Sequence, residues 1–156
     1  MTDPAAGRRP EACFEHRLRV SAADLDEQQH VNNVVYVQWV QDIATAHWHS
    51  LVPPECRVDL AWVLLRHEVD YQGAAVLDDA LVVATRVGHA KGLTFERFTE
   101  IRREDDGKVL ARSRTLWAPV DPRTGRPRRV SPEIRALFSA AIEAESAPED
   151  GARERG

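Results

Sequence analysis

A single helical stretch interrupts a chain that otherwise alternates with the period of β-strands, and this break limits the folds open to the chain. From residue 34 to 50 the apolar side chains recur at spacings of three and four, as on one face of a helix. Asn32 or Asn33 supplies a cap at the start, and Pro53-Pro54 forbids continuation at the other end. About 17 residues rising 1.5 Å each span roughly 25 Å, enough to cross a sheet of five strands. The spacing therefore predicts one buried helix lying across a sheet.

Five other segments show the alternation of apolar and polar residues that half-buried strands have. They cover residues 14–20, 63–71, 81–87, 93–103 and 108–120. Gly88 and Gly92 bracket a short connection, and Phe95 and Phe98 break the alternation that follows, which predicts a bulge. Since turn residues separate the last three strands, we expect a long antiparallel meander, then a short helix from residue 132 to about 141.

Composition favours one globular domain over residues 13–142, because 156 residues can bury a core without disulfides or a structural metal. Residues 1–12 and the acidic residues 143–156 have no periodicity, so we expect them to be disordered tails. No apolar run suits a membrane span or a secretory signal, which favours a cytoplasmic protein. The net charge of −4 excludes a general nucleic-acid binder, and the two cysteines, Cys13 and Cys56, form no CxxC pair.

The densest polar segment joins the first strand to the helix, from Asp24 to Asn33. One interpretation is turn and capping chemistry, in which the carboxylates and asparagines bind backbone N–H groups and His30 packs. The other interpretation is catalytic. A carboxylate and an imidazole beside a helix N-terminus, where free N–H groups suit an oxyanion, form the geometry that acyl transfer requires.

The residues Asp24-Leu25-Asp26, His30-Val31-Asn32-Asn33-Val34-Val35-Tyr36 and Trp39 resemble the signature of the hotdog-fold acyl thioesterases. That group includes the 4-hydroxybenzoyl-CoA thioesterase-like enzymes and the plant acyl-ACP thioesterases. The order of elements is similar from about residue 13 to 137. The resemblance implies an α+β hotdog fold, in which an antiparallel sheet of about five strands wraps around one long central helix, with a short C-terminal helix. It also implies hydrolysis of an acyl-CoA or acyl carrier protein thioester, with no metal or cofactor.

Residue roles follow from the same resemblance. Asp26 is the implied catalytic carboxylate, acting on water as general base or on the thioester carbonyl as nucleophile. The backbone N–H of Asn33 matches the family's oxyanion donor, and His30 matches a histidine of the plant-like branch. Two positions depart from the family's pattern: Gln28 stands in place of a catalytic asparagine, and Gln29 in place of a glycine that many bacterial members have.

The implied substrate contacts are Gln28, Asn32, Tyr36, Lys91, Gly92 and Thr94. Lys91 lies where the resemblance places contacts with coenzyme A phosphates. The basic run at residues 123–129 either meets a nucleotide phosphate or an acidic carrier protein, or is a solvated turn. An open sheet has unpaired edges, so the resemblance further implies a homodimer or homotetramer with sites at the subunit interface.

Two other functions are open to the same fold. A noncatalytic hotdog module that binds acyl groups would have the same core but would tolerate the loss of Asp26. A hotdog dehydratase or hydratase would need an acid/base pair around a carbon–carbon double bond, and the sequence has no separate aspartate-to-histidine motif of that kind.

Overall fold

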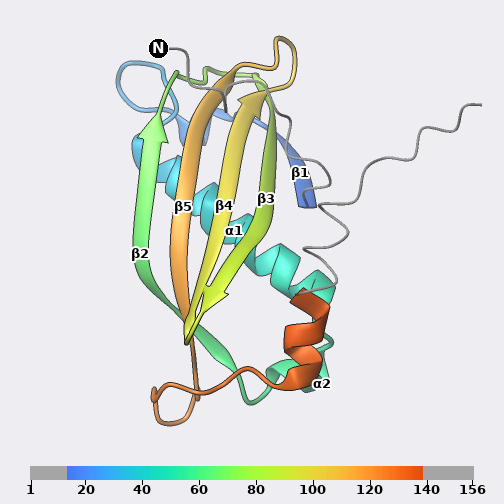
Figure 1. Ribbon diagram of the computed structural model, residues 1–156. Helices are drawn as coiled ribbons and strands as arrows, with labels where there is room; N and C mark the ends of the chain where they lie inside the picture. Colours follow the sequence, from blue (N-terminus) through green and yellow to red (C-terminus); the bar gives the residue numbers. More distant parts are fainter. Residues whose placement is uncertain (1–13, 139–156) are drawn as a thin grey trace, which may run out of the picture.

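In the computed structural model, which describes residues 14–138, a sheet curves around one long helix (Figure 1). Cys13 and the expected tails at 1–12 and 143–156 lie outside the described residues. The strands are β1 (Phe14–Arg19), β2 (Ala61–Tyr71), β3 (Ala80–Lys91), β4 (Thr94–Arg103) and β5 (Val109–Val120). The helices are η1 (Ala22–Asp24), α1 (Asn33–Leu51) and α2 (Pro54–Arg57), and a further helical turn covers 132–138.

All neighbouring strands are antiparallel, in the order β1-β3-β4-β5-β2. Consecutive strands pair only from β3 to β5, so the expected meander is shorter than the sequence suggests. The reason is α1, which crosses the sheet and carries the chain from β1 at one edge to β2 at the other (Figure 1). As a result β2, although second in sequence, is an edge strand, and within residues 14–138 its one partner strand is β5.

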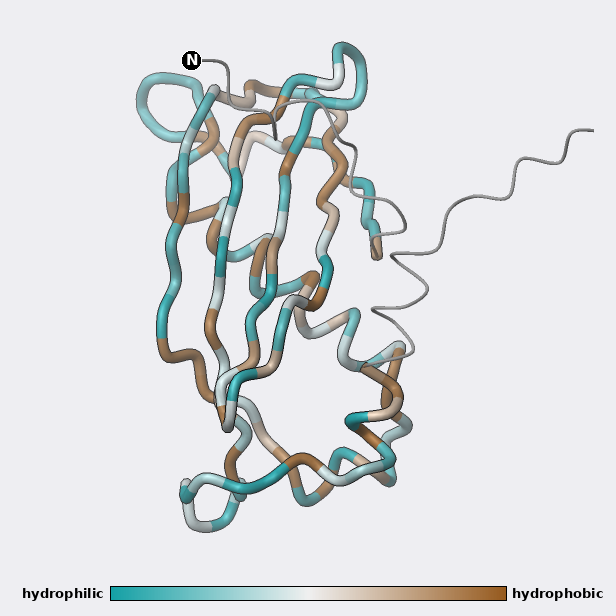
Figure 2. The backbone as a smooth tube through the Cα atoms, viewed as in Figure 1, coloured by the Kyte–Doolittle hydropathy of each residue, from teal (hydrophilic) through white to brown (hydrophobic). Residues whose placement is uncertain are grey.

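The helix α1 forms where the sequence predicts it. Asn32 caps it by accepting a hydrogen bond from the Val34 backbone N–H at 3.0 Å. Its buried side chains include Tyr36, Val40 and Ile43, at the expected spacings of four and three. They pack against apolar residues of β3, β4 and β5, and Figure 2 shows hydrophobic stretches along these strands. These partners are Leu81, Val83, Ile101, Leu110 and Ala111.

The strand β3 is longer than predicted, because it continues through Gly88 to Lys91. The expected connection from Gly88 to Gly92 is therefore wrong, and only the residues between Lys91 and Thr94 turn the chain. The register shifts between Val87 and Ala90. A Cβ atom at Gly88 would lie 2.9 Å from the Glu96 side chain, so glycine lets the strand pass there.

The strand β4 itself alternates regularly, and the irregularity expected from Phe95 and Phe98 lies in the facing strand, where the register of β3 shifts opposite Phe95 and Arg97. Arg97 points inward and is only 8% exposed, whereas Phe98 lies on the outer face. The interior accepts this cation because Arg97 Nη1 donates to His47 Nδ1 at 2.9 Å and to Thr85 Oγ1 at 3.2 Å. A charged residue at a core position thus hides the regular strand pattern.

The segment 132–138 is helical, as its Ser-Pro start predicts, and the rest of the expected helix lies outside the described residues. Ser131 Oγ accepts a hydrogen bond from the Ile134 backbone N–H at 3.3 Å. Ile134 and Phe138 are buried beside Val87. This turn therefore covers the end of the core that lies farthest from the start of α1 (Figure 1).

Candidate active site

The loop before α1 closes around the carboxylate of Asp26. Its Oδ1 accepts hydrogen bonds from the backbone N–H groups of Gln28, at 2.9 Å, and His30, at 3.2 Å. The Asp26 backbone N–H in turn donates to the His30 carbonyl at 2.7 Å. Gln29 completes the turn with φ at 62°, a left-handed conformation that glycine adopts most readily. The loop therefore fixes the orientation of Asp26 from its own backbone.

The second carboxylate oxygen of Asp26 is open to a substrate. Within residues 14–138, Oδ2 accepts no hydrogen bond and forms no ion pair. The side chain is half-buried, so water or a ligand reaches it from one side. A carboxylate held through one oxygen and open at the other can act as a base or a nucleophile.

Asp24 has a different environment, which is structural. Its Oδ2 accepts hydrogen bonds from the Ser21 backbone N–H at 2.9 Å and from Ser21 Oγ at 3.1 Å. Its carbonyl accepts from the Asn32 backbone N–H at 2.9 Å. Asp24 thus ties the entry to the loop to the exit, where α1 begins.

The start of α1 leaves one donor open. The Val34 N–H is bound by Asn32 Oδ1, and the Val35 N–H by the Asn32 carbonyl. Among the described residues the Asn33 N–H has no acceptor, as is common in the first turn of a helix. Because the positive end of the helix dipole lies there, this N–H suits a developing oxyanion.

Two tyrosines support this helix start from behind. Tyr71 Oη, at the end of β2, donates to the Asn33 carbonyl at 2.9 Å, a contact that the sequence does not indicate. Tyr36 is 2% exposed, and its hydroxyl accepts from the Ala75 backbone N–H at 3.0 Å. Burial raises the pKa of Tyr36, so its phenol stays protonated. The expected contact residue Tyr36 therefore lies in the core beside the site.

The polar loop residues lie at the surface. Gln28 and His30 are exposed, and within residues 14–138 neither side chain forms a hydrogen bond. The backbone of His30 pairs with Val76, which joins the loop to the segment before β3. The structure thus brings together five of the predicted residues on one loop and helix start. They are Asp26, Gln28, His30, Asn32 and Asn33.

The remaining three predicted residues, Lys91, Gly92 and Thr94, lie far from this loop in the same chain. The loop contacts the segment before β3, where the Val31 N–H donates to the Ala75 carbonyl at 2.9 Å. Lys91 ends β3, eleven residues after Ala80 and so about 36 Å away along the strand. A single chain therefore does not bring Lys91 to Asp26.

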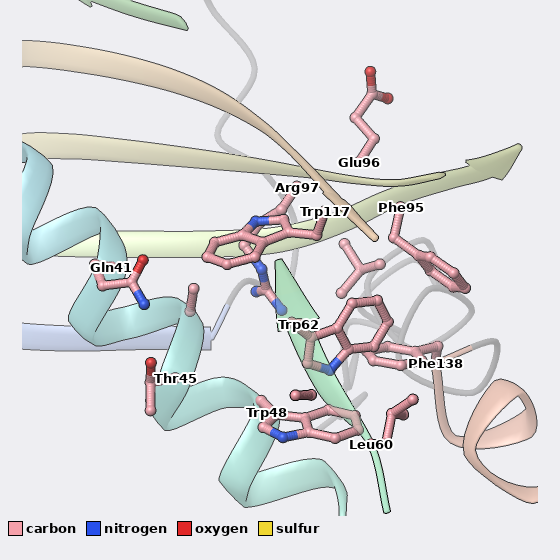
Figure 3. Close-up of a pocket in the computed structure, with 13 residues that line it drawn as sticks. Gln41, Thr45, Trp48, Leu60, Trp62, Phe95, Glu96, Arg97, Trp117 and Phe138 are labelled. Carbon is pink, nitrogen blue, oxygen red and sulfur yellow. The ribbon is translucent and has the colours of Figure 1, made fainter. Parts of the chain in front are cut away.

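A cavity of about 220 Å³ lies between the second half of α1 and the sheet (Figure 3). Its walls include the aromatic residues Trp48, Trp62, Phe95, Trp117 and Phe138, together with Gln41, Ala44, Thr45, Leu60, Ala61, Val87 and Arg97. The Glu96 side chain points away from it (Figure 3). This cavity could not be predicted from the sequence, because its aromatic residues come from five separate segments.

Arg97 reaches from β4 across the cavity wall toward α1 (Figure 3). Burial, and secondarily the Arg97 charge, lower the pKa of His47 to about 4. His47 is therefore neutral near pH 7, and its Nδ1 is the acceptor for the Arg97 guanidinium. Regular alternation along β4 is the signal that would have placed Arg97 inside.

Two further features bear on the class of protein. Within residues 14–138, no group of three or more His, Cys, Asp or Glu side chains comes together as metal ligands would. Over the same residues, no helix combines the length and apolar character that crossing a membrane requires.

Comparison with known proteins connects this geometry to a family. The sequence profile of the acyl-ACP thioesterase C-terminal domain family matches residues 7–119. The chain belongs to this family. Membership confirms the resemblance, and with it the enzyme class expected from the sequence, a thioester hydrolase.

Individual relatives of this acyl-ACP thioesterase-family protein are distant. Long-chain acyl-CoA thioesterase FadM of Escherichia coli K12 is 24% identical over 134 residues, which cover 83% of this chain and 99% of FadM. Slr0204 of Synechocystis, a 1,4-dihydroxy-2-naphthoyl-CoA thioesterase, is 20% identical with a TM-score of 0.70, over 82% of this chain and 96% of its own. SAV2348 of Staphylococcus aureus, solved in complex with CoA, is 14% identical with a TM-score of 0.80, over 96% and 98%. These structures confirm the hotdog fold.

Proposed function

We propose that this protein hydrolyses the thioester of an acyl-CoA or an acyl carrier protein, with Asp26 as the catalytic carboxylate. One observation carries the proposal: Asp26 is fixed through Oδ1, open at Oδ2, and lies on the loop that leads into the open N–H of Asn33. A base or nucleophile and an oxyanion donor are the two parts that thioester hydrolysis requires.

The chemistry suits these parts. A thioester carbonyl has less resonance stabilisation than an ester, and its leaving group is a thiolate. In the proposed reaction Asp26 Oδ2 takes a proton from an attacking water or itself attacks the carbonyl carbon. The Asn33 N–H then stabilises the oxyanion as the C–S bond breaks, and the thiolate leaves with a proton from solvent. Where water attacks, this step gives the free acid directly. Where Asp26 attacks, the acyl group remains on its carboxylate as an anhydride, which water then hydrolyses to the free acid and the restored carboxylate.

Three neighbours are assigned supporting parts. Gln28 and His30 present exposed amide and imidazole groups on the same loop as Asp26, where they can orient water or the leaving group. Asn32 caps the start of α1 through its side chain. Its assigned role is therefore to position the Asn33 N–H as well as to contact the substrate. Tyr36 is assigned a structural place in the wall of the site, because its hydroxyl accepts a hydrogen bond from the Ala75 backbone N–H.

We propose coenzyme A as the thiol carrier, with a homodimer as the working unit. SAV2348, of the same fold, was solved with CoA, and FadM is named for acyl-CoA substrates. The dimer is proposed on the edge strand β2, whose outer side is unpaired in one chain and carries the exposed residues Val63, Leu64 and Leu65. A homotetramer would consist of two such dimers joined through a second interface.

The proposal is tested by measuring thiol release from a panel of acyl-CoAs and acyl carrier proteins. We expect multiple turnovers, with free acid and free thiol released in equal amounts, and higher kcat/KM for acyl-CoAs. Binding of acyl-CoA without thiol release would identify a noncatalytic acyl-binding module instead. Hydration of an enoyl-CoA with its thioester intact would identify a hydratase.

A further inference from the structure

Tyr71 reaches from the sheet to the peptide group that follows the open N–H of Asn33. It ends β2, beside the start of α1 (Figure 1), and its hydroxyl donates to the Asn33 carbonyl at 2.9 Å. That carbonyl belongs to the peptide group between Asn33 and Val34, whose N–H donates to Asn32 Oδ1 at 3.0 Å. One peptide group is therefore held at both ends, from β2 on one side and from the helix cap on the other.

The open Asn33 N–H depends on this peptide group for its direction. The N–H and the carbonyl of one residue are joined through its Cα atom, so two torsion angles set their relative orientation. The peptide group before Asn33 is held as well, because the Asn32 carbonyl accepts from the Val35 N–H at 2.9 Å. All of these groups lie in the first turn of a helix, where helices fray. A tether from the sheet therefore limits fraying at the place where the oxyanion would be bound.

The ring of Tyr71 is fixed, whereas its hydroxyl does not need Asn33 as a partner. The ring packs edge-on against Tyr36, with 5.5 Å between the ring centroids, and the Tyr36 hydroxyl accepts from the Ala75 N–H at 3.0 Å. Tyr71 is 45% exposed, and an exposed phenol can bind water instead of protein. The contact with Asn33 thus orients the helix start and is not required to satisfy a buried polar group.

The residues that follow Tyr71 hold the loop around Asp26. Val76 pairs through its backbone with His30. His30 in turn donates from its N–H to Asp26 Oδ1 and accepts from the Asp26 N–H at its carbonyl. The chain from 71 to 76 therefore contacts both the carboxylate loop and the start of α1, and it fixes the position of one relative to the other.

Arg103, at the end of β4, anchors the same stretch of chain. Its Nη2 donates to the Ala74 carbonyl at 3.2 Å, and its Nε donates to Asp79 Oδ2 at 3.3 Å. The same Asp79 oxygen accepts from the Val76 N–H at 3.0 Å. Tyr71 therefore adjoins a segment that is itself tied to the sheet.

We propose that Tyr71 is a positioning residue for the thioesterase reaction, because its hydroxyl holds the first turn of α1 so that the Asn33 N–H points at the developing oxyanion. The proposal rests on the proposed function, in which that N–H is the oxyanion donor. Tyr71 acts through Asn33 and not on the substrate. Since the oxyanion forms only during the reaction, loss of the tether should lower kcat and leave KM unchanged.

Tyr71→Phe gives the first test, since it removes the hydroxyl and keeps the ring against Tyr36. Ser50→Ala is the matched control, because Ser50 Oγ also donates to a carbonyl of α1, that of His47 at 2.7 Å, at the opposite end of the helix. On the acyl-CoA of the panel with the highest kcat/KM, Tyr71→Phe should lower kcat about five- to twentyfold and change KM less than about twofold. The control should keep its kcat, and both variants should keep the urea midpoint of the wild type.

Three outcomes of this test would overturn the proposal. An unchanged kcat with a lower urea midpoint would show that Tyr71 has a structural role alone. A raised KM at unchanged kcat would show that Tyr71 contacts the substrate. Equal losses of kcat in Tyr71→Phe and Ser50→Ala would show that the effect does not depend on the start of α1.

A double variant gives the second test, because Asn32 and Tyr71 hold the same peptide group. If both act by holding it, either substitution alone already releases it. Asn32→Ala combined with Tyr71→Phe should therefore lose less kcat than the product of the two single losses. Losses that multiply would show that Tyr71 acts at another place, and the positioning role would be wrong.

A failure of the proposed function would look different. The wild type would then release no thiol from any substrate, so the reaction named in the proposal would be wrong while the tether itself could still be measured. Amide hydrogen exchange of the Val34 N–H, which Asn32 Oδ1 binds, reports on the first turn without any substrate. Exchange should be at least about threefold faster in Tyr71→Phe than in the wild type and in Ser50→Ala. Equal exchange rates in the three proteins would overturn the tether as well.

Discussion

Gln29 shows how closely the loop around Asp26 depends on single residues. Its backbone is left-handed, with φ at 62°, at the position where the resemblance implies glycine in many bacterial members. The turn it completes lets both the Gln28 and His30 N–H groups reach Asp26 Oδ1. The glutamine therefore adopts a left-handed backbone conformation that the hydrogen bonds around Asp26 require.

At the same scale, His30→Ala separates chemistry from packing. The His30 side chain is exposed and forms no hydrogen bond within residues 14–138, so its loss should change the free energy of unfolding by less than about 0.5 kcal/mol. If the imidazole takes part in proton transfer, kcat should fall at least tenfold. Urea unfolding and steady-state kinetics on the same preparation measure both. A His30→Ala variant with a lower free energy of unfolding and an unchanged kcat would show that His30 serves packing and not proton transfer.

Among the elements, α1 and the strand β2 could be predicted from periodicity, since each has a consistent apolar face. Two features could not. The edge position of β2 depends on where α1 crosses the sheet, which no local pattern contains. The partners that hold Arg97 on the inner face, His47 and Thr85, lie on other elements and follow from no pattern within β4. Likewise, Asp26 and Asn33 could be identified from the motif, but Tyr71 contacts Asn33 across 38 residues.

The cap of α1 links stability to the oxyanion donor. Asn32→Ala removes the acceptor for the Val34 N–H, which should cost about 1 kcal/mol of unfolding free energy. Because the first turn then frays, the Asn33 N–H loses its fixed position and kcat should fall as well. Asn32→Asp is the matched control, since a carboxylate caps equally well. Full kcat in Asn32→Ala together with the loss of stability would contradict the positioning role.

The contact between α1 and β4 should make stability depend on pH. The pKa of His47 is lowered to about 4 in the folded protein, against about 6.5 in the unfolded chain. The unfolded chain therefore binds the proton first, and this contribution to stability, full above pH 6.5, is lost as the pH falls toward 4. By pH 4.5 the loss should reach roughly 2 to 3 kcal/mol.

Urea unfolding of the wild type and His47→Gln at pH 7 and pH 4.5 measures this loss. Glutamine supplies an acceptor for Arg97 but does not titrate. Other groups contribute equally to both proteins, so the wild type should lose more stability on acidification. The same loss in both proteins would show that His47 is not the group responsible.

At the scale of the whole molecule, the groups assigned to the site lie at two ends of the chain, and the dimer proposed through β2 would join them. Asp26 and the start of α1 lie at one end of the sheet, and Lys91 and the aromatic cavity lie at the other. Antiparallel pairing through β2 would bring the first end of one subunit to the second end of its partner.

The Lys91→Ala variant tests whether Lys91 contributes to substrate binding and not to the chemical step. Contacts with nucleotide phosphates are far from the reacting carbonyl and act on ground state and transition state alike. Lys91→Ala should therefore raise KM for an acyl-CoA about three- to tenfold and leave kcat nearly unchanged. The matching acyl-pantetheine, which lacks the nucleotide, should show no change in KM. Equal increases on both substrates would mean that Lys91 supports the fold or the acyl channel.

The account depends most on Asp26, and turnover of the purified Asp26→Asn variant tests it most directly. Asparagine retains an oxygen that can accept the Gln28 and His30 N–H groups, so the loop should keep its shape and the protein its stability. It cannot act as base or nucleophile. Asp42→Asn, an exposed change on α1, is the matched control. We predict that Asp26→Asn, folded as the wild type, has less than a tenth of wild-type kcat while the control has full kcat. More than a tenth, a barrier change below about 1.4 kcal/mol, would contradict the assignment of Asp26 as the catalytic carboxylate.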